Sequence, residues 1–242
     1  RGLAGHSSSD YGFSSGGYTS SVIDKFAFSS NTTASDHGDL TVSVGGLVGF
    51  SSSDSGFTAG GEDSGTKTNT INKFSFSSNV TASDHGDLIS SKYLAAGISS
   101  ADYGFYAGGH PGGPGSGINV IEKFAVSSNT TATDHGDLSA TRYRGPGASS
   151  SDYGFVNGGA NSNVIDRFAY SSNTTATDWG NVTVTRNEGY AGSSSTTQGF
   201  TSGGYNGTHT DIIDKFNFSS AGNASDHGDL SVARSDNAGT QY

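Results

Sequence analysis

The residues of this sequence that are best suited to chemistry recur in a short motif. The motif reads Asp-His-Gly-Asp at 36–39, 84–87, 134–137 and 226–229. Carboxylates and imidazoles are ligands for hard and borderline cations, but a calcium loop needs about six oxygen ligands. The remaining copy, Asp-Trp-Gly-Asn at 178–181, lacks the His and the second Asp. We therefore interpret the motif as an Asp-x-Gly turn, and we expect neither a metal site nor another cofactor.

A catalytic site is a second interpretation of the polar residues. Serine runs at 7–9, 51–53, 149–151 and 193–195 lie near histidines in the sequence. Acidic residues that could act as general bases precede a basic residue at Asp24, Glu122, Asp166 and Asp214, and Asn72 takes their place in one copy. An enzyme site is normally single and asymmetric. We predict no enzyme and assign the acidic residues to ion pairs between repeating units.

Asn-x-Ser/Thr sequences form a third recurrent pattern. They begin at Asn31, Asn79, Asn129, Asn173 and Asn223, with further examples at Asn181 and Asn206. In a secreted protein such sites can carry N-linked glycans, which would surround the molecule. Asn is also a frequent turn residue. The sequence leaves both interpretations open.

The composition excludes several classes of protein. The net charge is −10, from 12 Lys and Arg against 22 Asp and Glu. A nucleic-acid-binding protein needs clustered basic residues, so we predict no nucleic-acid partner. No stretch approaches 18 apolar residues, so no membrane span is expected. The sequence has no Cys, which excludes a disulfide framework and thiol catalysis.

These motifs belong to a unit that occurs five times. Each unit has a basic residue followed by Phe, and the Asp of the turn motif comes eleven residues after the basic residue. The pairs are Lys25-Phe26, Lys73-Phe74, Lys123-Phe124, Arg167-Phe168 and Lys215-Phe216. We place the repeats at about 1–44, 45–92, 93–142, 143–186 and 187–234 of a single domain, 1–242. Residues 235–242 are then a tail or a closing strand.

Each unit reads as four short strands separated by turn residues, without helical periodicity. Four strands in about 48 residues are typical of a propeller blade. We predict an all-β, five-bladed propeller with four antiparallel strands in each blade. Alternate residues such as Phe26 and Phe28 share one face of the third strand. We expect these aromatic positions in all five units to pack between blades.

The order of motifs resembles the kelch repeat. The fourth unit carries the segment YGFVNGG, then Phe168 and Tyr170, then Trp179 and Arg186. His37, His85, His135 and His227 stand where the resemblance would place Trp. We interpret these histidines as wedges between neighbouring blades.

The connections between the second and third strands vary most in length and content. Loops at one end of a rigid scaffold are frequent binding sites. The candidate residues for binding a ligand or partner are Tyr18, His110, Tyr205, His209 and Asp211.

Three functions are compatible with these features. The tandem units are similar to repeats of virion and tail-fibre-like proteins of aquatic bacteriophages and of other surface appendages. That resemblance implies a non-enzymatic extracellular structural or attachment module, on a virion or in a fibre, whose partners are other subunits or cell-surface glycans and which could form homo-oligomers or filaments. The second is a multivalent carbohydrate-binding propeller. The third is a kelch-type adaptor that binds protein.

Overall fold

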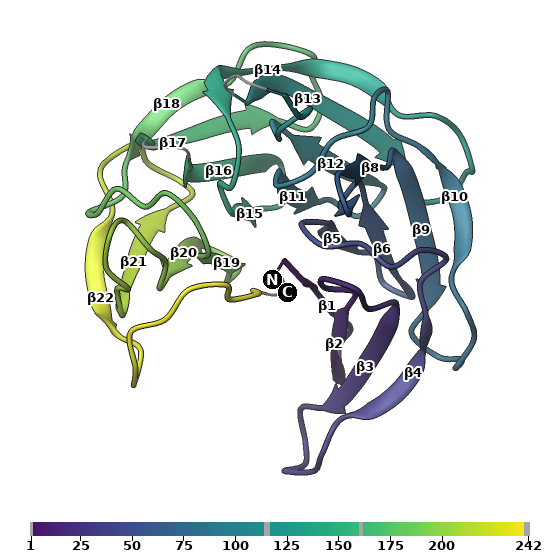
Figure 1. The fold of residues 1–242 in the computed structure, drawn as a ribbon. Coiled ribbons are helices and arrows are strands. Elements are labelled where there is room, and N and C mark those ends of the chain that lie inside the picture. Colours follow the sequence, from purple (N-terminus) through teal and green to yellow (C-terminus); the bar gives the residue numbers. More distant parts are fainter. Residues whose placement is uncertain (1, 114–116, 160–161, 240–242) are drawn as a thin grey trace.

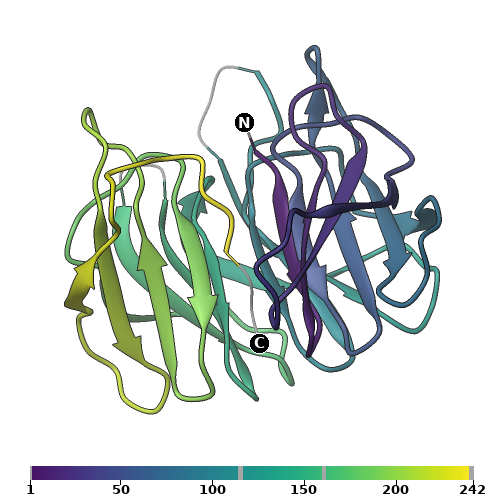
Figure 2. The ribbon, with the colours of Figure 1, turned by 90° about the horizontal axis from the view of Figure 1, so that it is seen from below.

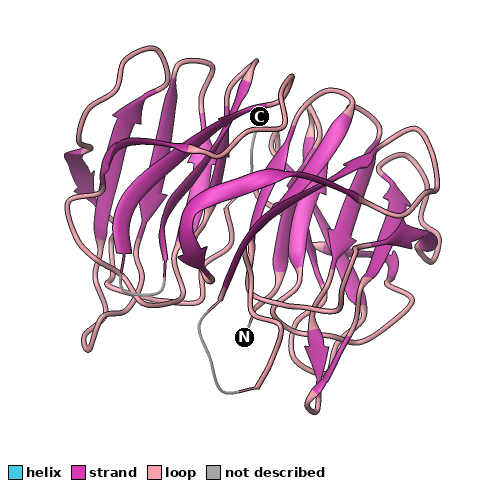
Figure 3. Cartoon of the chain, turned by 90° about the horizontal axis from the view of Figure 1, so that it is seen from above, coloured by secondary structure: helices cyan, strands magenta, loops and turns pink. Residues whose placement is uncertain are grey.

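A computed structural model describes residues 2–113, 117–159 and 162–239. In these ranges the chain contains strands and no helix. The strands form five antiparallel sheets of four strands each, arranged around an axis as the blades of a propeller (Figures 1 and 3). The predicted fold is therefore confirmed. Because the described residues form no helix, they include none that could cross a membrane.

The chain enters each blade at the axis and builds it outward. The first blade has β1 (Ala4–Ser7), β2 (Tyr11–Ser15), β3 (Val22–Ala27) and β4 (Ser35–Asp39); the second has β5 (Val48–Ser51), β6 (Ser55–Ala59), β9 (Thr70–Ser75) and β10 (Ser83–Asp87). The third has β11 (Ala96–Ser99), β12 (Tyr103–Ala107), β13 (Ile118–Ala125) and β14 (Thr133–Arg142). The fourth has β15 (Gly147–Ser149), β16 (Tyr153–Gly159), β17 (Ser162–Ala169) and β18 (Thr177–Asn181), and the fifth has β19 (Ala191–Ser194), β20 (Gln198–Ser202), β21 (Ile212–Asn217) and β22 (Ser225–Asp229). A hairpin of β7 (Glu62–Asp63) and β8 (Thr66–Lys67) extends one loop of the second blade.

Phenylalanines hold neighbouring blades together. Phe105 on β12 lies 5.4 Å from Phe168 of the next blade and stacks on Tyr170 at 4.8 Å, measured between ring centroids. Phe155 makes the same contacts with Phe216 and Phe218 one blade further on. Each buried Phe contributes about 1.5–3 kcal/mol to stability. The apolar core of the molecule therefore lies between the blades.

The expectation that every third strand is covered in this way is wrong for the first blade. Phe26 is 40% exposed and Phe28 is 53% exposed, whereas Phe168 at the equivalent position is 3% exposed. Among the described residues, no hydrogen bond, ion pair or ring contact joins β2–β4 to β20–β22. The ring is therefore open between the first and fifth blades, as Figure 1 shows between β4 and β22.

The inner strand β1 and the described part of the tail both lie near the axis beside this opening (Figure 1). β1 pairs with β2 as the inner strand of its own blade, so the tail does not replace it. The described part of the tail runs from the fifth blade toward the axis and passes between β19 and β1 (Figure 2). Residues 240–242 lie outside the described residues.

The inner strands approach one another so closely that a side chain would not fit. A Cβ on Gly97 would overlap the carbonyl oxygen of Gly49 on the neighbouring inner strand. Gly147 and Gly192 have the same relation to the inner strand before them. Glycine at these positions is thus required by the spacing of the blades around the axis.

One inner strand carries a buried histidine. The side chain of His6 is fully buried, and its Nδ1 donates a hydrogen bond to the carbonyl of Phe50, 3.0 Å away. Because a carbonyl can only accept, Nδ1 carries the proton of the neutral ring, and Nε2 accepts from the hydroxyl of Ser15 at 2.7 Å. Burial, partly offset by the bond to Phe50, lowers the pKa of His6 to about 4.

We expect His6 to make the fold sensitive to acid. Its pKa in the folded state lies below the unfolded value of 6.5, so its contribution is complete above pH 6.5 and is lost as the pH falls toward 4. At 1.36 kcal/mol per pH unit, the loss approaches about 3 kcal/mol. Urea unfolding of the wild type and of His6→Gln from pH 7 to 4 measures it. The wild type should lose more stability than the variant, and two parallel curves would contradict this assignment.

Candidate functional site: the mouth of the axial channel

The Asp-x-Gly motifs form the turn that the sequence predicts. In each blade the carboxylate of the first Asp accepts a hydrogen bond from the backbone N–H two residues later, as Asp84 does from Gly86 at 2.7 Å. The Gly has a positive φ, which is 112° at Gly86. Among the described residues, no group of three His, Asp or Glu side chains could hold a metal ion.

The histidine that follows this Asp connects two blades. The ring of His85 lies 5.0 Å from that of Phe57 in its own blade, and Nε2 donates to the carbonyl of Ala125 in the next blade at 2.9 Å. Trp179 does the same in the fourth blade, where Nε1 donates to Asn217 at 2.8 Å. His and Trp can therefore exchange at this position, because either ring supplies an apolar face and an N–H donor.

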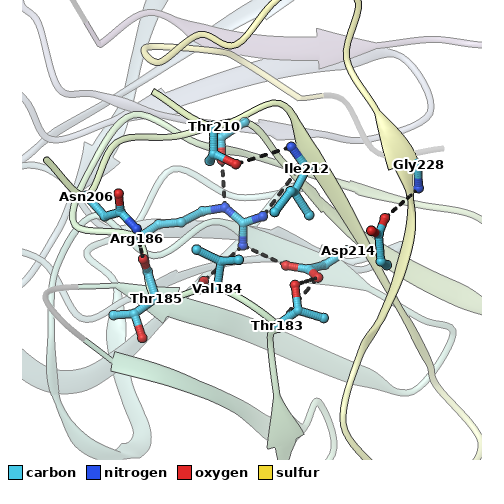
Figure 4. A network of polar contacts seen from close by, with 11 residues as sticks. Thr183, Val184, Thr185, Arg186, Asn206, Thr210, Ile212, Asp214 and Gly228 are labelled. Atoms are coloured by element: carbon cyan, nitrogen blue, oxygen red, sulfur yellow. Dashed lines mark hydrogen bonds and ion pairs between the residues drawn. The ribbon is translucent and has the colours of Figure 1, made fainter. Parts of the chain in front are cut away.

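Three of the four acidic residues that precede a basic residue form buried ion pairs between blades, and the expectation of such a pair is wrong for Asp24, which is exposed. Arg186, at the end of one blade, pairs with Asp214 of the next at 2.6 Å (Figure 4). Its Nε donates to the carbonyl of Gly203. Arg142 pairs with Asp166 at 2.9 Å in the same way, and Lys92 pairs with Glu122. A buried charge is tolerated when it is paired and hydrogen-bonded.

Each acidic side chain also accepts a backbone hydrogen bond from the preceding blade. Ser139 N–H donates to Asp166 at 3.0 Å, and Thr183 N–H donates to Asp214 at 3.3 Å. Burial raises the pKa of Asp166, and Arg142 and Ser139 counteract that rise. These side chains therefore link neighbouring blades through ion pairs and hydrogen bonds.

The first interface shows that the ion pair can be replaced by neutral residues. Val44 stands where Arg186 stands in the fourth blade, and Asn72 stands where Asp214 stands in the fifth. Both are buried, and Asn72 still accepts the backbone N–H of Thr41 at 3.1 Å. The two partners thus depart from the charged pattern together.

The inner strands surround an axial channel, and the serine runs that follow these strands line one end of it. Their cavity has a volume of about 840 Å³, and its described lining contains serines with one Ala and one Thr and no acidic residue or His. Ser51 N–H donates to the hydroxyl of Ser99 at 3.1 Å, and Ser99 N–H donates to that of Ser149 at 3.2 Å. These hydroxyls link neighbouring inner strands.

Six of the sequon asparagines lie in exposed connections and Asn181 is the half-buried last residue of β18; several of them hold the turns of adjacent blades together. Asn79 donates through Nδ2 to the carbonyl of Asp36, Asn129 donates to Asp84, and Asn173 donates to Asp134. Asn181 donates to Asn223, whose side-chain oxygen accepts the bond. Asn206 donates to Thr185, and Asn31 is exposed. The amide nitrogen that would carry a glycan thus donates a hydrogen bond at five of the seven positions.

The five loop candidates do not form one site. Tyr18 is 64% exposed and lines a cavity at the mouth of the channel. His110 instead packs between Tyr93 and Tyr143, at ring distances of 5.6 and 5.1 Å. Tyr205 and His209 contact each other at 5.1 Å in the fifth blade. Asp211 lies next to the start of β21, where its carbonyl accepts the N–H of Leu230.

The cavity at the mouth has a volume of about 300 Å³. Its walls come mainly from the segments that lead from one blade to the inner strand of the next, and they include Tyr93, Arg144, Glu188 and Asp236. These residues were not among the predicted binding residues, all of which lie in the loops inside each blade. A signal was available in the second residue of each link, which differs in every unit: Gly46, Leu94, Arg144, Glu188 and Asp236.

The mouth combines aromatic and charged groups. Arg144 pairs with Glu188 at 2.8 Å, and both side chains remain partly exposed, at 34% and 41%. Burial, with the nearby carboxylate of Glu62, raises the pKa of Tyr93. Leu94 and Arg144 have φ values of 60° and 63°, which are strained for residues other than Gly. Such strain often accompanies binding sites. This arrangement can offer hydrogen bonds and a tyrosine face to a ligand.

Comparison with known proteins adds no family. No family model matches the sequence, and no curated protein matches it.

We expect the loss of one charged partner of the buried ion pair to destabilise the fold more than the replacement of both partners by neutral residues. Arg186→Val leaves Asp214 buried without its partner and should cost about 3–5 kcal/mol of unfolding free energy. The double variant Arg186→Val with Asp214→Asn reproduces the neutral pair Val44 and Asn72, and it should recover roughly half of that loss or more.

Urea unfolding at pH 7 measures both variants. Arg234→Val is the matched control, since Arg234 has the same place in its blade but is exposed. It should be nearly neutral. A double variant as unstable as the single one would show that the charges themselves are required.

Proposed function

We propose that this protein is a non-enzymatic extracellular attachment module, a subunit or domain of a fibre, fibril or virion appendage. The observation that carries the proposal is the contrast between a regular frame and an irregular mouth. The same ring contacts and hydrogen bonds recur at the interfaces between blades, whereas the residues around the mouth differ from blade to blade. A rigid scaffold that varies at one end suits recognition of a target.

The composition and the repeat support the same proposal. The chain is acidic, with a net charge of −10, and has no Cys that would depend on the redox state of a compartment. Its unit is kelch-like in the order of Gly-Gly, basic-Phe and His or Trp, and similar units occur in phage tail-fibre-like proteins. The partners are then neighbouring subunits and surface glycans.

Immunogold electron microscopy tests the location. Antibodies raised against the chain should label fibres, virions or other external appendages in native material that contains it. The reason is that an attachment module must be displayed where its target can reach it. Labelling confined to the interior of intact cells would overturn the proposal, and pre-immune serum supplies the control.

Carbohydrate binding is the second candidate, and the chemistry of the mouth favours it. Tyr18 is largely exposed, and Tyr93 lies near the carboxylate of Glu62. A tyrosine ring can stack on the apolar face of a sugar while carboxylates accept hydrogen bonds from its hydroxyls. The mouth would provide a single sugar site for the whole ring, whereas a multivalent propeller would have one sugar site in each blade. The adaptor function has no observation of its own in its favour.

Glycan-array binding tests this candidate. Tyr18→Ala and Tyr93→Ala should each weaken binding roughly tenfold or more, because a stacked tyrosine at the centre of a site contributes about 1–2 kcal/mol. Tyr103→Ala is the matched control, since Tyr103 is 37% exposed at the start of β12, near the serine end of the channel. Titration calorimetry should give one sugar site per chain. Equal losses in all three variants, or five sites, would contradict a site at the mouth.

A further inference from the structure

The opening between the first and fifth blades leaves two apolar sheet faces uncovered. We call these faces, with the space between them, the seam. The first-blade wall contains Phe26 and Phe28, which are 40% and 53% exposed. The fifth-blade wall contains Phe200 and His227. Phe200 is only partly buried, whereas Phe105 and Phe155 at the equivalent position are fully buried. The seam is therefore a blade interface with both halves present and neither covered.

The polar groups of the seam also lack the partners that their equivalents have. At the four closed interfaces, an Ala N–H of one blade donates to a carbonyl of the blade before it, as Ala132 does to Asp87 and Ala176 to Asp137, both at 2.7 Å. At the seam, neither the donor Ala34 N–H nor the acceptor Asp229 carbonyl makes this bond. The ring of His227 likewise makes no hydrogen bond to a carbonyl across the seam, whereas His85 and His135 each bond to a carbonyl of the next blade.

The two residue positions that form the ion pair at other interfaces are divided between the two walls of the seam. Arg234 occupies the position of Arg186, and Asp24 occupies the position of Asp214. Both are exposed, and neither has an ion-pair partner among the described residues. Each wall thus presents one half of the ion pair that is buried elsewhere.

The backbone conformation of the tail indicates what kind of segment could fill the seam. At five places the residue that begins an approach to the axis has a φ near 65° and is followed three residues later by a Gly of the inner strand, which is close-packed in the second to fifth blades. These first residues are Gly2, Gly46, Leu94, Arg144 and Gly189, with φ from 60° to 73°. Asp236 repeats the conformation with φ of 60°, and Gly239 follows three residues later. A Cβ on Gly239 would overlap the carbonyl of Gly192, as Gly192 would that of Gly147.

Backbone hydrogen bonds set the tail in the same register. Gly204 N–H donates to the carbonyl of Arg234 at 2.8 Å, as Gly109 N–H does to Arg142 at 2.9 Å. At the start of the tail the match is looser, because the N–H that donates to Gly189 at 3.3 Å belongs to Asn237, one residue after the position from which Leu94 and Arg144 donate. Residues 236–239 therefore occupy the place of the inner strand of a sixth blade, beside β19 (Figure 2).

We infer that the seam is a docking site for one further blade of the same repeat, which adds its three outer strands to the inner strand that the tail supplies. Such a unit brings a Gly-Phe strand to cover Phe26 and Phe28. Its Lys-Phe-x-Phe strand covers Phe200 and accepts the hydrogen bond of His227. Its own acidic and basic residues pair with Arg234 and Asp24.

Two other occupants fit less well. Direct closure of the first blade on the fifth would bring β1 beside β19, where the tail now lies. A second copy of this chain would bring blades that already have inner strands, and that position is filled. A unit that lacks only its inner strand meets neither obstacle.

A chain extended by such a unit tests the inference. Because Gly239 aligns with Gly192, a copy of residues 196–234 appended after Tyr242 continues the register. The chain has no Cys, so Phe28→Cys gives a single reporter thiol on the first-blade wall. Docking should slow maleimide labelling of this thiol at least about tenfold relative to the unextended chain, because the thiol then reacts only when the blade opens.

The matched control is the same extension with Ser in the appended copy at the positions of Phe200 and Phe216. Its thiol should label as fast as in the unextended chain. Equal labelling in both extended chains would overturn the inference. Slow labelling of the unextended chain would also overturn it, by direct closure if the rate is independent of concentration and by self-association if it is not. His227→Cys on the other wall provides a second reporter if Phe28→Cys fails to fold.

Discussion

The structure depends on the contact between a phenylalanine of one blade and the aromatic residues of the next. Phe105 lies against Phe168 and Tyr170, and His135 of its own blade lies 5.0 Å away. A blade has few apolar residues that it could bury within itself, since its glycine-rich inner strands have little side chain to bury. Stability therefore comes from the stacking of neighbours, as in other repeat architectures. The exposed Phe26 and Phe28 show what remains when a neighbour is missing.

Polar groups determine how the stacked blades align. An apolar contact alone tolerates sliding, because the hydrophobic effect has no direction. The bond from His85 to Ala125 and the pair of Arg186 with Asp214 have defined geometries. They leave buried groups unpaired if a blade shifts, which is costly. This explains why a ring with an N–H donor follows the turn Asp in every unit and why the ion pair recurs at three of the four closed interfaces.

The mouth and the seam are where this regularity stops. The frame requires the same residues in each unit, so a feature that is not repeated is free to serve binding. At the mouth, Tyr18, Tyr93, Arg144 and Glu188 come from different units, and Arg144 and Glu188 have no equivalents of the same type around the ring. At the seam, the residues are the repeated ones, but their partners are absent. The first place suits a foreign ligand, and the second suits more of the same protein.

The sequence by itself determined the local structure and the number of blades. Strand length, the turn at Asp84 and Gly86, and the alternation of Phe74 and Phe76 are properties of neighbouring residues, and they recur in five registers. It also indicated that the acidic residues pair between blades, because Asn72 broke their row without breaking the repeat.

Only the tertiary structure decided which copies of a motif have a partner. Phe26 and Phe168 have the same local sequence, yet one is exposed and the other is buried, because burial depends on whether another blade lies opposite. The mouth was invisible for the same reason. Tyr93 and Glu188 are far apart in the chain and meet only because each link between blades returns to a common axis. The sequence period specifies one blade, whereas the extent of the ring that five blades complete is set by how neighbouring blades pack.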